Sequence, residues 1–208
     1  SIGLLSIAVS AFIGILMGIW MATSKRLAVK NTLLGIATLG VSIPGFVTAI
    51  LLMMVFGVWW PVLPIVGLGS PANYILPVAA QSFGQIASIA RLTKSTYSEA
   101  IQMDYVTMAR AKGLSNLYIT VRHVLKNALI PVVTYFGPAI AFLITGSFVV
   151  ESIFSIPGIG REFTNAITNR DYTVVLGFSV FIGVIITVAN LAVDIICSLI
   201  DPRIKLTN

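Results

Sequence analysis

The sequence predicts an all-α protein that crosses a membrane several times, and composition and charge placement both support this prediction. Of the 208 residues, 57% are hydrophobic and only 10% are charged, and the mean hydropathy is +0.99. A soluble domain carries about 25% charged residues. Composition therefore excludes a soluble enzyme, a disordered chain and a disulfide scaffold. The charged residues are also clustered, which leaves four stretches without any: Ser1–Ser24, Asn31–Ala90, Asn127–Val150 and Tyr172–Val193.

These charge-free stretches have the lengths of transmembrane helices, because about 20 apolar residues cross a hydrocarbon layer about 30 Å thick. The second stretch is long enough for two spans, and the Pro and Gly residues that follow Trp59 predict a turn between them. Strands are excluded, because the runs are continuously apolar and lack the alternation of a membrane-spanning strand. Five transmembrane helices in one domain are therefore expected, at about residues 1–23, 32–58, 74–98, 127–150 and 172–198.

Basic residues alternate between the connections of these spans, and this alternation predicts the topology. The regions of the first and third connections and the C-terminal tail hold eleven Lys and Arg residues, whereas the second and fourth connections hold two. Because basic residues are enriched in cytoplasmic loops, segment 99–126 is expected in the cytoplasm and segment 151–171 outside it. Ser1 is then also outside. One more span is expected before Ser1, which would return both chain ends to the cytoplasm.

The third connection has the pattern of two short helices. Asp104 begins the first helix and Arg110 and Lys112 lie near its end, so that each charge opposes the helix macrodipole. Gly113 is expected to stop this helix, and Ser115 is expected to cap the second one. The small residues of the first helix favour packing on another protein over resting on lipid. The apolar positions expected on one face of it are Tyr105, Met108 and Ala109.

Four motifs follow one another along the chain: Asp104–Leu114, Glu151–Gly160, Asn169–Tyr172 and Asp201–Ile204. The first resembles the EAA-type cytoplasmic loop of ABC importer permeases. Together the four motifs resemble, more narrowly, the dipeptide, oligopeptide and nickel permease family, and the resemblance extends from the first span to the tail. It implies the core of a six-span type I importer permease in a bacterial or archaeal plasma membrane.

The resemblance also implies a function and a set of partners. The chain would form half of a translocation pathway for dipeptides or oligopeptides, beside a second, homologous permease. Two ATP-binding subunits would drive import, and an extracytoplasmic binding protein would deliver the substrate. The residues that the resemblance assigns to the helix docking on the ATP-binding subunits are Asp104, Tyr105, Ala109, Arg110, Ala111, Lys112, Gly113 and Leu114.

No catalytic or cofactor-binding chemistry is expected in the chain itself. It has no GxxxxGK[ST] phosphate-binding loop, so ATP and Mg²⁺ are expected on the partner subunits. The single histidine, His123, lacks neighbouring ligands for a transition-metal site, and the single cysteine, Cys197, implies neither a disulfide nor redox chemistry. The net charge of +6 indicates orientation in a lipid bilayer, and nucleic acid is not an expected partner.

The connection at 151–171 is a second candidate site. Its apolar turn lies among charged residues outside the membrane, where it is expected to meet a substrate-binding protein or to line an outer gate. A plain connection between two spans is an equally favoured interpretation. The candidate residues are Pro157, Gly158, Gly160, Arg170 and Asp171.

Several features leave alternatives open. Uncharged polar residues in the spans, among them Gln81 and Gln85, suit a path for peptides, although hydrogen bonding between helices is the favoured interpretation. Gly14, Gly18 and Ala22 recur at four-residue spacing, which fits either a packing face or, as the favoured interpretation, chance. Nickel complexes are an alternative substrate, and a secondary transporter or a channel is an alternative class.

Overall fold

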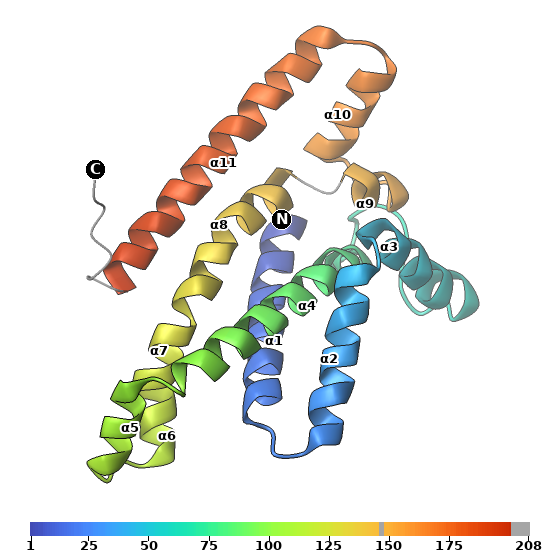
Figure 1. Cartoon of the computed structure of the whole chain (residues 1–208). Coiled ribbons are helices and arrows are strands. Elements are labelled where there is room, and N and C mark those ends of the chain that lie inside the picture. The colour runs from blue at the N-terminus through green and yellow to red at the C-terminus, as the bar shows by residue number, and fades with distance from the viewer. Residues whose placement is uncertain (146–147, 201–208) are drawn as a thin grey trace.

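The computed structural model describes residues 1–145 and 148–200, and within these residues the chain is helical and contains no strand. Long helices make up the body of the molecule and short helices lie at its ends (Figure 1). The all-α prediction is therefore confirmed, whereas the C-terminal motif Asp201–Ile204 lies outside the described residues. The long helices are α1 (Ile2–Thr23), α2 (Leu27–Ser42), α4 (Ile75–Ala100), α8 (Ile130–Thr145) and α11 (Tyr172–Ile200).

Two helices are long and apolar enough to cross a membrane, judged by length and composition within the described residues. They are α1 and α11, which lie over the predicted spans 1–23 and 172–198. A bent pair that begins with α2 makes a third candidate. The remaining two spans, 74–98 and 127–150, stay predictions.

The residues expected as one span over 32–58 form two helices at an angle of 103° to each other. Pro44 explains the break, because proline lacks the N–H that would bond to the Gly40 carbonyl. Proline also disfavours a helical conformation of the preceding residue, and Ile43 is accordingly extended, with φ −84° and ψ 121°. A bent pair therefore replaces the single helix expected here. Its members are α2 and, after the break, α3 (Gly45–Met53) with the π-helix η1 (Met54–Trp59).

Helix α4 lies at the centre of the fold and packs against α1, α2, α3 and α8 (Figure 1). Glycines on α1 allow a close approach. A Cβ atom on Gly18 would lie 2.5 Å from the Cβ of Thr93, and one on Gly14 would lie 2.8 Å from the Cβ of Ile89. Both glycines are buried. Their recurrence is therefore a packing face, and the favoured interpretation as chance was wrong.

One end of the molecule is a lobe of short helices between α4 and α8, and we call residues 101–129 the basic lobe (Figure 1). It follows directly from the end of α4 and leads directly into α8, so both long helices are anchored in it. Its elements are α5 (Asp104–Ala111), α6 (Asn116–Ile119), the π-helix η3 (Thr120–Val124) and α7 (Leu125–Ala128).

An apolar cluster holds the opposite end together and joins distant parts of the chain. The loop after η1 is tied to it, because the Gly67 N–H donates to the Phe154 carbonyl at 3.0 Å. Segment 151–171, expected as a loop, is largely helical. The buried members of the cluster are Ala49, Leu76, Ala80, Val150, Phe154 and Ile156. The short elements of this end are the 3₁₀-helix η2 (Pro71–Tyr74), α9 (Phe148–Ile153) and α10 (Ile159–Thr168).

Gly18→Leu is expected to destabilise the protein by about 1–3 kcal/mol, because a large side chain would force α1 away from α4. Gly35→Ala is the matched control, since a Cβ atom on Gly35 meets nothing within 4 Å and alanine favours a helix. Thermal unfolding of the purified protein in detergent measures both effects. Equal unfolding temperatures for the two variants would contradict the packing role of Gly18.

Candidate functional site

The basic lobe is attached to α4 by an apolar core on its inner side. Val106 is fully buried and Ala109 is 5% exposed, and both belong to one cluster with Tyr97 and Ala100 at the end of α4. The cluster excludes water from the joint; within it α7 packs on α4, and α5 packs on α6 and η3. The other buried members of this cluster are Ile119, Val124 and Ala128.

The outer side of α5 is exposed. Met108 is 62% exposed, although it was predicted on one face with Tyr105 and Ala109. Val106 and Ala109 are three residues apart and share the inward face, which turns Met108 outward and leaves Tyr105 partly buried. Ala109, predicted as part of the docking helix, is therefore placed in the core of the lobe. The exposed residues around Met108 are Asp104, Arg110, Ala111, Lys112, Gly113, Leu114, Leu117 and Tyr118.

Helix α5 ends in a hydrogen-bonded turn that requires Gly113. This residue has a φ of +74°, in the left-handed region that glycine adopts without strain. Its N–H donates to the Arg110 carbonyl at 2.9 Å, and the Leu114 N–H donates to the Ala109 carbonyl at 3.3 Å. These two bonds form a Schellman motif. The predicted stop at Gly113 is confirmed.

Ser115 caps the next helix, as the sequence predicts. Its Oγ accepts a hydrogen bond from the Tyr118 N–H at 3.4 Å. The rings of Tyr118 and His123 pack in a T-shaped, edge-to-face arrangement, with centroids 5.8 Å apart. The single histidine of the chain therefore packs within the basic lobe.

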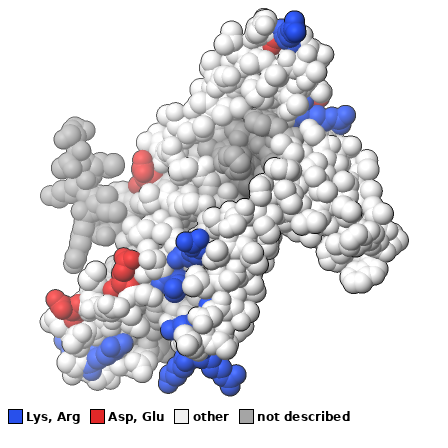
Figure 2. Space-filling model, turned by 45° about the vertical axis from the view of Figure 1, so that its right-hand side comes forward, with Lys and Arg blue, Asp and Glu red and all other residues white. Residues whose placement is uncertain are grey.

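Lys and Arg side chains gather at the end of the molecule that carries the basic lobe (Figure 2). A smaller group of charged side chains lies at the opposite end, and the surface between them is largely uncharged in this view. The lobe therefore shares its end of the molecule with the basic residues of the α1–α2 connection and of the end of α4, and acidic side chains lie among them in this view. The basic residues of this region are Lys25, Arg26, Lys30, Arg91, Lys94, Arg110, Lys112, Arg122 and Lys126.

At the other end, Glu151 caps α10 from a neighbouring helix. Its carboxylate accepts a hydrogen bond from the Arg161 N–H at 3.0 Å. A Cβ atom on Gly158 would collide with this carboxylate, so a larger residue there would displace the Glu151 cap. Desolvation by burial raises the pKa of Glu151 from 4.5, against the opposite effect of the backbone N–H groups of Arg161 and Gly160. Gly160 is buried, whereas Pro157 is exposed.

Arg170 and Asp171 join α10 to α11. Arg170 has a φ of 57°, and the Asp171 N–H donates to the Ala166 carbonyl at 2.9 Å, which closes the end of α10. The Oδ1 atom of Asp171 accepts a hydrogen bond from the Val174 N–H at 3.1 Å and so caps α11. Both residues are exposed. The structure therefore shows the connecting role directly, while it leaves their charges free to meet a partner.

These features describe a helical membrane protein that carries an exposed lobe at one end. Helix α1 and the bent pair of α2 and α3 pack on α4, and α11 packs on α8. One end carries a lobe whose inner side is packed on α4 and whose outer side is exposed.

The chain belongs to the family of binding-protein-dependent transport system inner membrane components, whose family model matches residues 14–206. It is 42% identical to the dipeptide transport system permease protein DppB of Bacillus subtilis (strain 168), over 99% of this chain and 67% of that protein. It is 40% identical to the oligopeptide transport system permease protein OppB of Salmonella typhimurium, over 98% of this chain and 67% of that protein. The chain is thus a permease component of the inner membrane, and the secondary transporter and the channel are disfavoured.

Solved structures of two transporters share the fold. A chain of the MetNI methionine ABC transporter in inward facing conformations superposes with a TM-score of 0.73 at 17% identity, over 96% of this chain and 92% of that chain. A chain of an amino acid ABC transporter with histidines superposes with a TM-score of 0.63 at 19% identity, over 98% and 90% of the two chains. At these identities the likeness concerns the fold alone.

The raised pKa of Glu151 predicts a pH dependence of stability. Because the folded-state pKa is above 4.5, the protonated carboxyl favours the fold, and this contribution is lost as pH rises through the folded-state pKa. Glu151→Gln keeps an oxygen for the Arg161 N–H and cannot ionise, so its unfolding temperature should rise relative to the wild type above about pH 4.5. Thermal unfolding between about pH 4 and pH 8 measures the difference.

Glu151→Ala is the matched control, because it also removes the ionisation but leaves the Arg161 N–H without an acceptor. It should destabilise the protein across the whole pH range. Parallel pH profiles for the wild type and Glu151→Gln would contradict the assignment of this dependence to Glu151.

Proposed function

We propose that the chain forms half of the translocation pathway of an ATP-driven importer for dipeptides and oligopeptides, beside a second, homologous permease. Relatives named as peptide permeases, at 42% and 40% identity, support this substrate class. The observation that carries the coupling to ATP is the basic lobe, whose core is continuous with α4 and whose outer surface is exposed. The importer acts in the inner membrane of a bacterium or archaeon.

We infer five membrane crossings: α1, the bent pair of α2 and α3, α4, the span 127–150 that contains α8, and α11. This order leaves the basic lobe in the cytoplasm and α10 outside. The charges of the described residues support it, because nine Lys and Arg residues lie on the lobe side and two lie on the other side.

The basic lobe is the surface on which an ATP-binding subunit docks. Met108 and Leu114 offer apolar contacts, while Arg110 and Lys112 suit a cleft with an acidic rim. Ala109 acts from inside, where it holds α5 on the lobe. The residues assigned to coupling are Asp104, Tyr105, Ala109, Arg110, Ala111, Lys112, Gly113 and Leu114.

Movement of the docked subunits reaches the pathway through packed contacts. Val106 lies in one apolar cluster with Tyr97 and Ala100 at the end of α4 and with Ala128 just before α8, and α7 packs directly on α4. A displaced lobe therefore tilts α4 and α8 together, which changes the side on which the pathway is open. ATP and Mg²⁺ are bound by the partner subunits, because the chain lacks a phosphate-binding loop.

Segment 151–171, which lies outside the membrane, receives the substrate-binding protein. Gly158 lies against the Glu151 carboxylate, Gly160 is buried in the first turn of α10, and Pro157 is exposed beside them. Arg170 and Asp171 present opposite charges at the joint between α10 and α11. This surface is held in place by the outer apolar cluster, so it offers a preformed contact to the loaded binding protein.

The proposal predicts ATP-dependent peptide uptake by the complete transporter. The permease pair, its two ATP-binding subunits and its binding protein are reconstituted in vesicles, and uptake of labelled dipeptides and oligopeptides is compared with uptake of labelled nickel complexes. Peptide uptake that requires ATP supports the proposed substrate class. Uptake of nickel complexes alone would replace it with the alternative substrate.

The same vesicles test the proposed contact between segment 151–171 and the binding protein. Arg170→Glu reverses one exposed charge and spares the Asp171 cap of α11. This variant should reduce the stimulation of ATP hydrolysis by the loaded binding protein. Unchanged stimulation would favour a plain connection between α10 and α11.

Gly113→Glu is expected to lower ATP-dependent uptake by about tenfold or more, because it adds left-handed backbone strain and a negative charge to the docking surface. Gly113→Asn is the matched control, since asparagine tolerates the left-handed region and a Cβ atom meets nothing within 4 Å there. Uptake and copurification of the ATP-binding subunits are measured together. Normal values of both for Gly113→Glu would contradict docking at this turn.

A further inference from the structure

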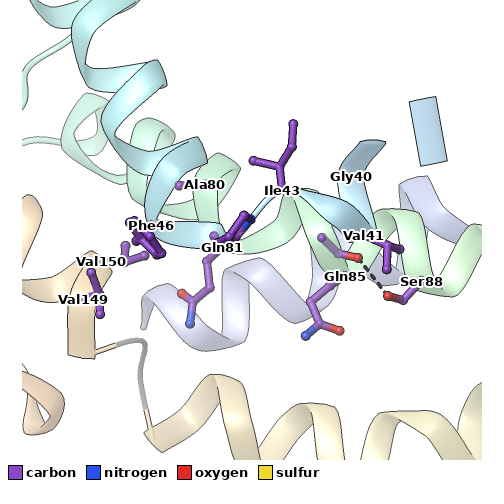
Figure 3. A pocket seen from close by; sticks show the side chains of 13 residues that line it. Gly40, Val41, Ile43, Phe46, Ala80, Gln81, Gln85, Ser88, Val149 and Val150 are labelled. Atoms are coloured by element: carbon purple, nitrogen blue, oxygen red, sulfur yellow. Dashed lines mark hydrogen bonds between the residues drawn. The ribbon is translucent and has the colours of Figure 1, made fainter. Parts of the chain in front are cut away.

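A cavity of about 390 Å³ lies where the break between α2 and α3 faces α4 and α9 (Figure 3). Its size is within the range of small-molecule sites, about 300–1,000 Å³. None of its lining residues is charged. It opens beside Val41, Phe46 and Val149, which are 46–48% exposed. The lining residues that matter below are Gly40, Pro44, Gln81, Gln85 and Ser88.

Gln81 and Gln85 bring two carboxamide groups to this cavity from the same side of α4 (Figure 3). The Oε1 atom of Gln85 accepts a hydrogen bond from the Tyr135 hydroxyl at 2.8 Å, and that of Gln81 accepts one from the Ser6 hydroxyl at 3.4 Å. Neither Nε2 group has a partner among the residues that the structure describes. The oxygen atoms thus orient both amides, and the donor ends are unused.

Other polar groups at the cavity are mostly satisfied or supply acceptors. The Ser88 hydroxyl donates to the Gly84 carbonyl at 3.0 Å. The Gly40 carbonyl lacks its usual helical donor, because residue 44 is proline. The cavity therefore combines two unused donor groups, the Nε2 groups of Gln81 and Gln85, with one acceptor, the Gly40 carbonyl. None of its lining residues is charged. This combination matches a neutral ligand that carries both carbonyl and N–H groups.

We propose that this cavity binds the main chain of the transported peptide, with the Nε2 groups of Gln81 and Gln85 donating to two of its carbonyl oxygens. The proposal rests on the peptide importer function proposed above. Every peptide offers these carbonyls whatever its side chains are. An uncharged wall therefore holds varied peptides without selecting their side chains.

The spacing of the two glutamines fits an extended peptide. They are four residues apart on a helix, so they are separated by about 6 Å along α4. Alternate residues of an extended chain are about 6.6 Å apart, and their carbonyls point to the same side. Two such peptide carbonyls require at least four residues, because the carbonyl of the third residue belongs to a peptide bond only when a fourth residue follows. Tetrapeptides and longer peptides can thus engage both amides, whereas dipeptides and tripeptides can engage only one through a peptide carbonyl.

The test compares a tetrapeptide with an analogue in which one inner carbonyl is a thioamide, whose sulfur is a poor acceptor. Both are used at saturating concentration in vesicles that contain the complete transporter and its binding protein. When the thioamide replaces a carbonyl that accepts from Gln81 or Gln85, the wild type should transport the parent tetrapeptide about threefold to tenfold faster than the analogue. The double variant Gln81→Met, Gln85→Met should reduce this ratio toward one and should slow the parent by a similar factor.

Matched variants separate binding from folding. Asn31→Met removes a carboxamide from an exposed position at the start of α2 and should keep the wild-type ratio. Gln81→Met alone loses only the long hydrogen bond to Ser6, so it should assemble normally and still lower the ratio. A double variant that assembles and keeps the wild-type ratio would overturn the proposal. A wild type that transports no peptide would instead overturn the proposed function.

Discussion

The close packing of α1 on α4 is the contact on which the rest of the structure depends. Gly14 and Gly18 allow the backbone of α1 to approach Ile89 and Thr93 without intervening side chains. In a membrane, helices associate through such packing and not through exclusion of water. Because α4 also contacts α2, α3 and α8, its position sets the place of every long helix except α11, which packs on α8.

The same helix connects the two regions that we propose to carry function. Its inner end, with Tyr97 and Ala100, forms part of the core of the basic lobe. Its outer half carries Gln81 and Gln85 at the cavity and Leu76 and Ala80 in the outer cluster. A partner that moves the lobe therefore acts on a rigid element that also lines the proposed path, which is a direct mechanical route for coupling.

Features set by local chemistry were predictable from the sequence. Gly113 and Ser115 lie at helix ends, where backbone groups need a particular residue type, and both act as predicted. The orientation of α5 was not predictable, because Tyr105, Val106, Met108 and Ala109 are all apolar or small enough to face a core. Glu151 was also missed as a cap, since it reaches the Arg161 N–H only after the chain has turned between α9 and α10.

Composition and the placement of charge by themselves determined an all-α membrane protein, and the ordered motifs pointed to its family. These properties depend on whether each residue prefers lipid or water and on the order of residues in short stretches of chain. The residue types alone are therefore enough to predict them. The tertiary structure decided that α2 and α3 lie at 103° to each other and that two glutamines meet a cavity beside the break. It also decided which face of α5 is free. These depend on contacts between residues far apart in the chain, which no local pattern encodes.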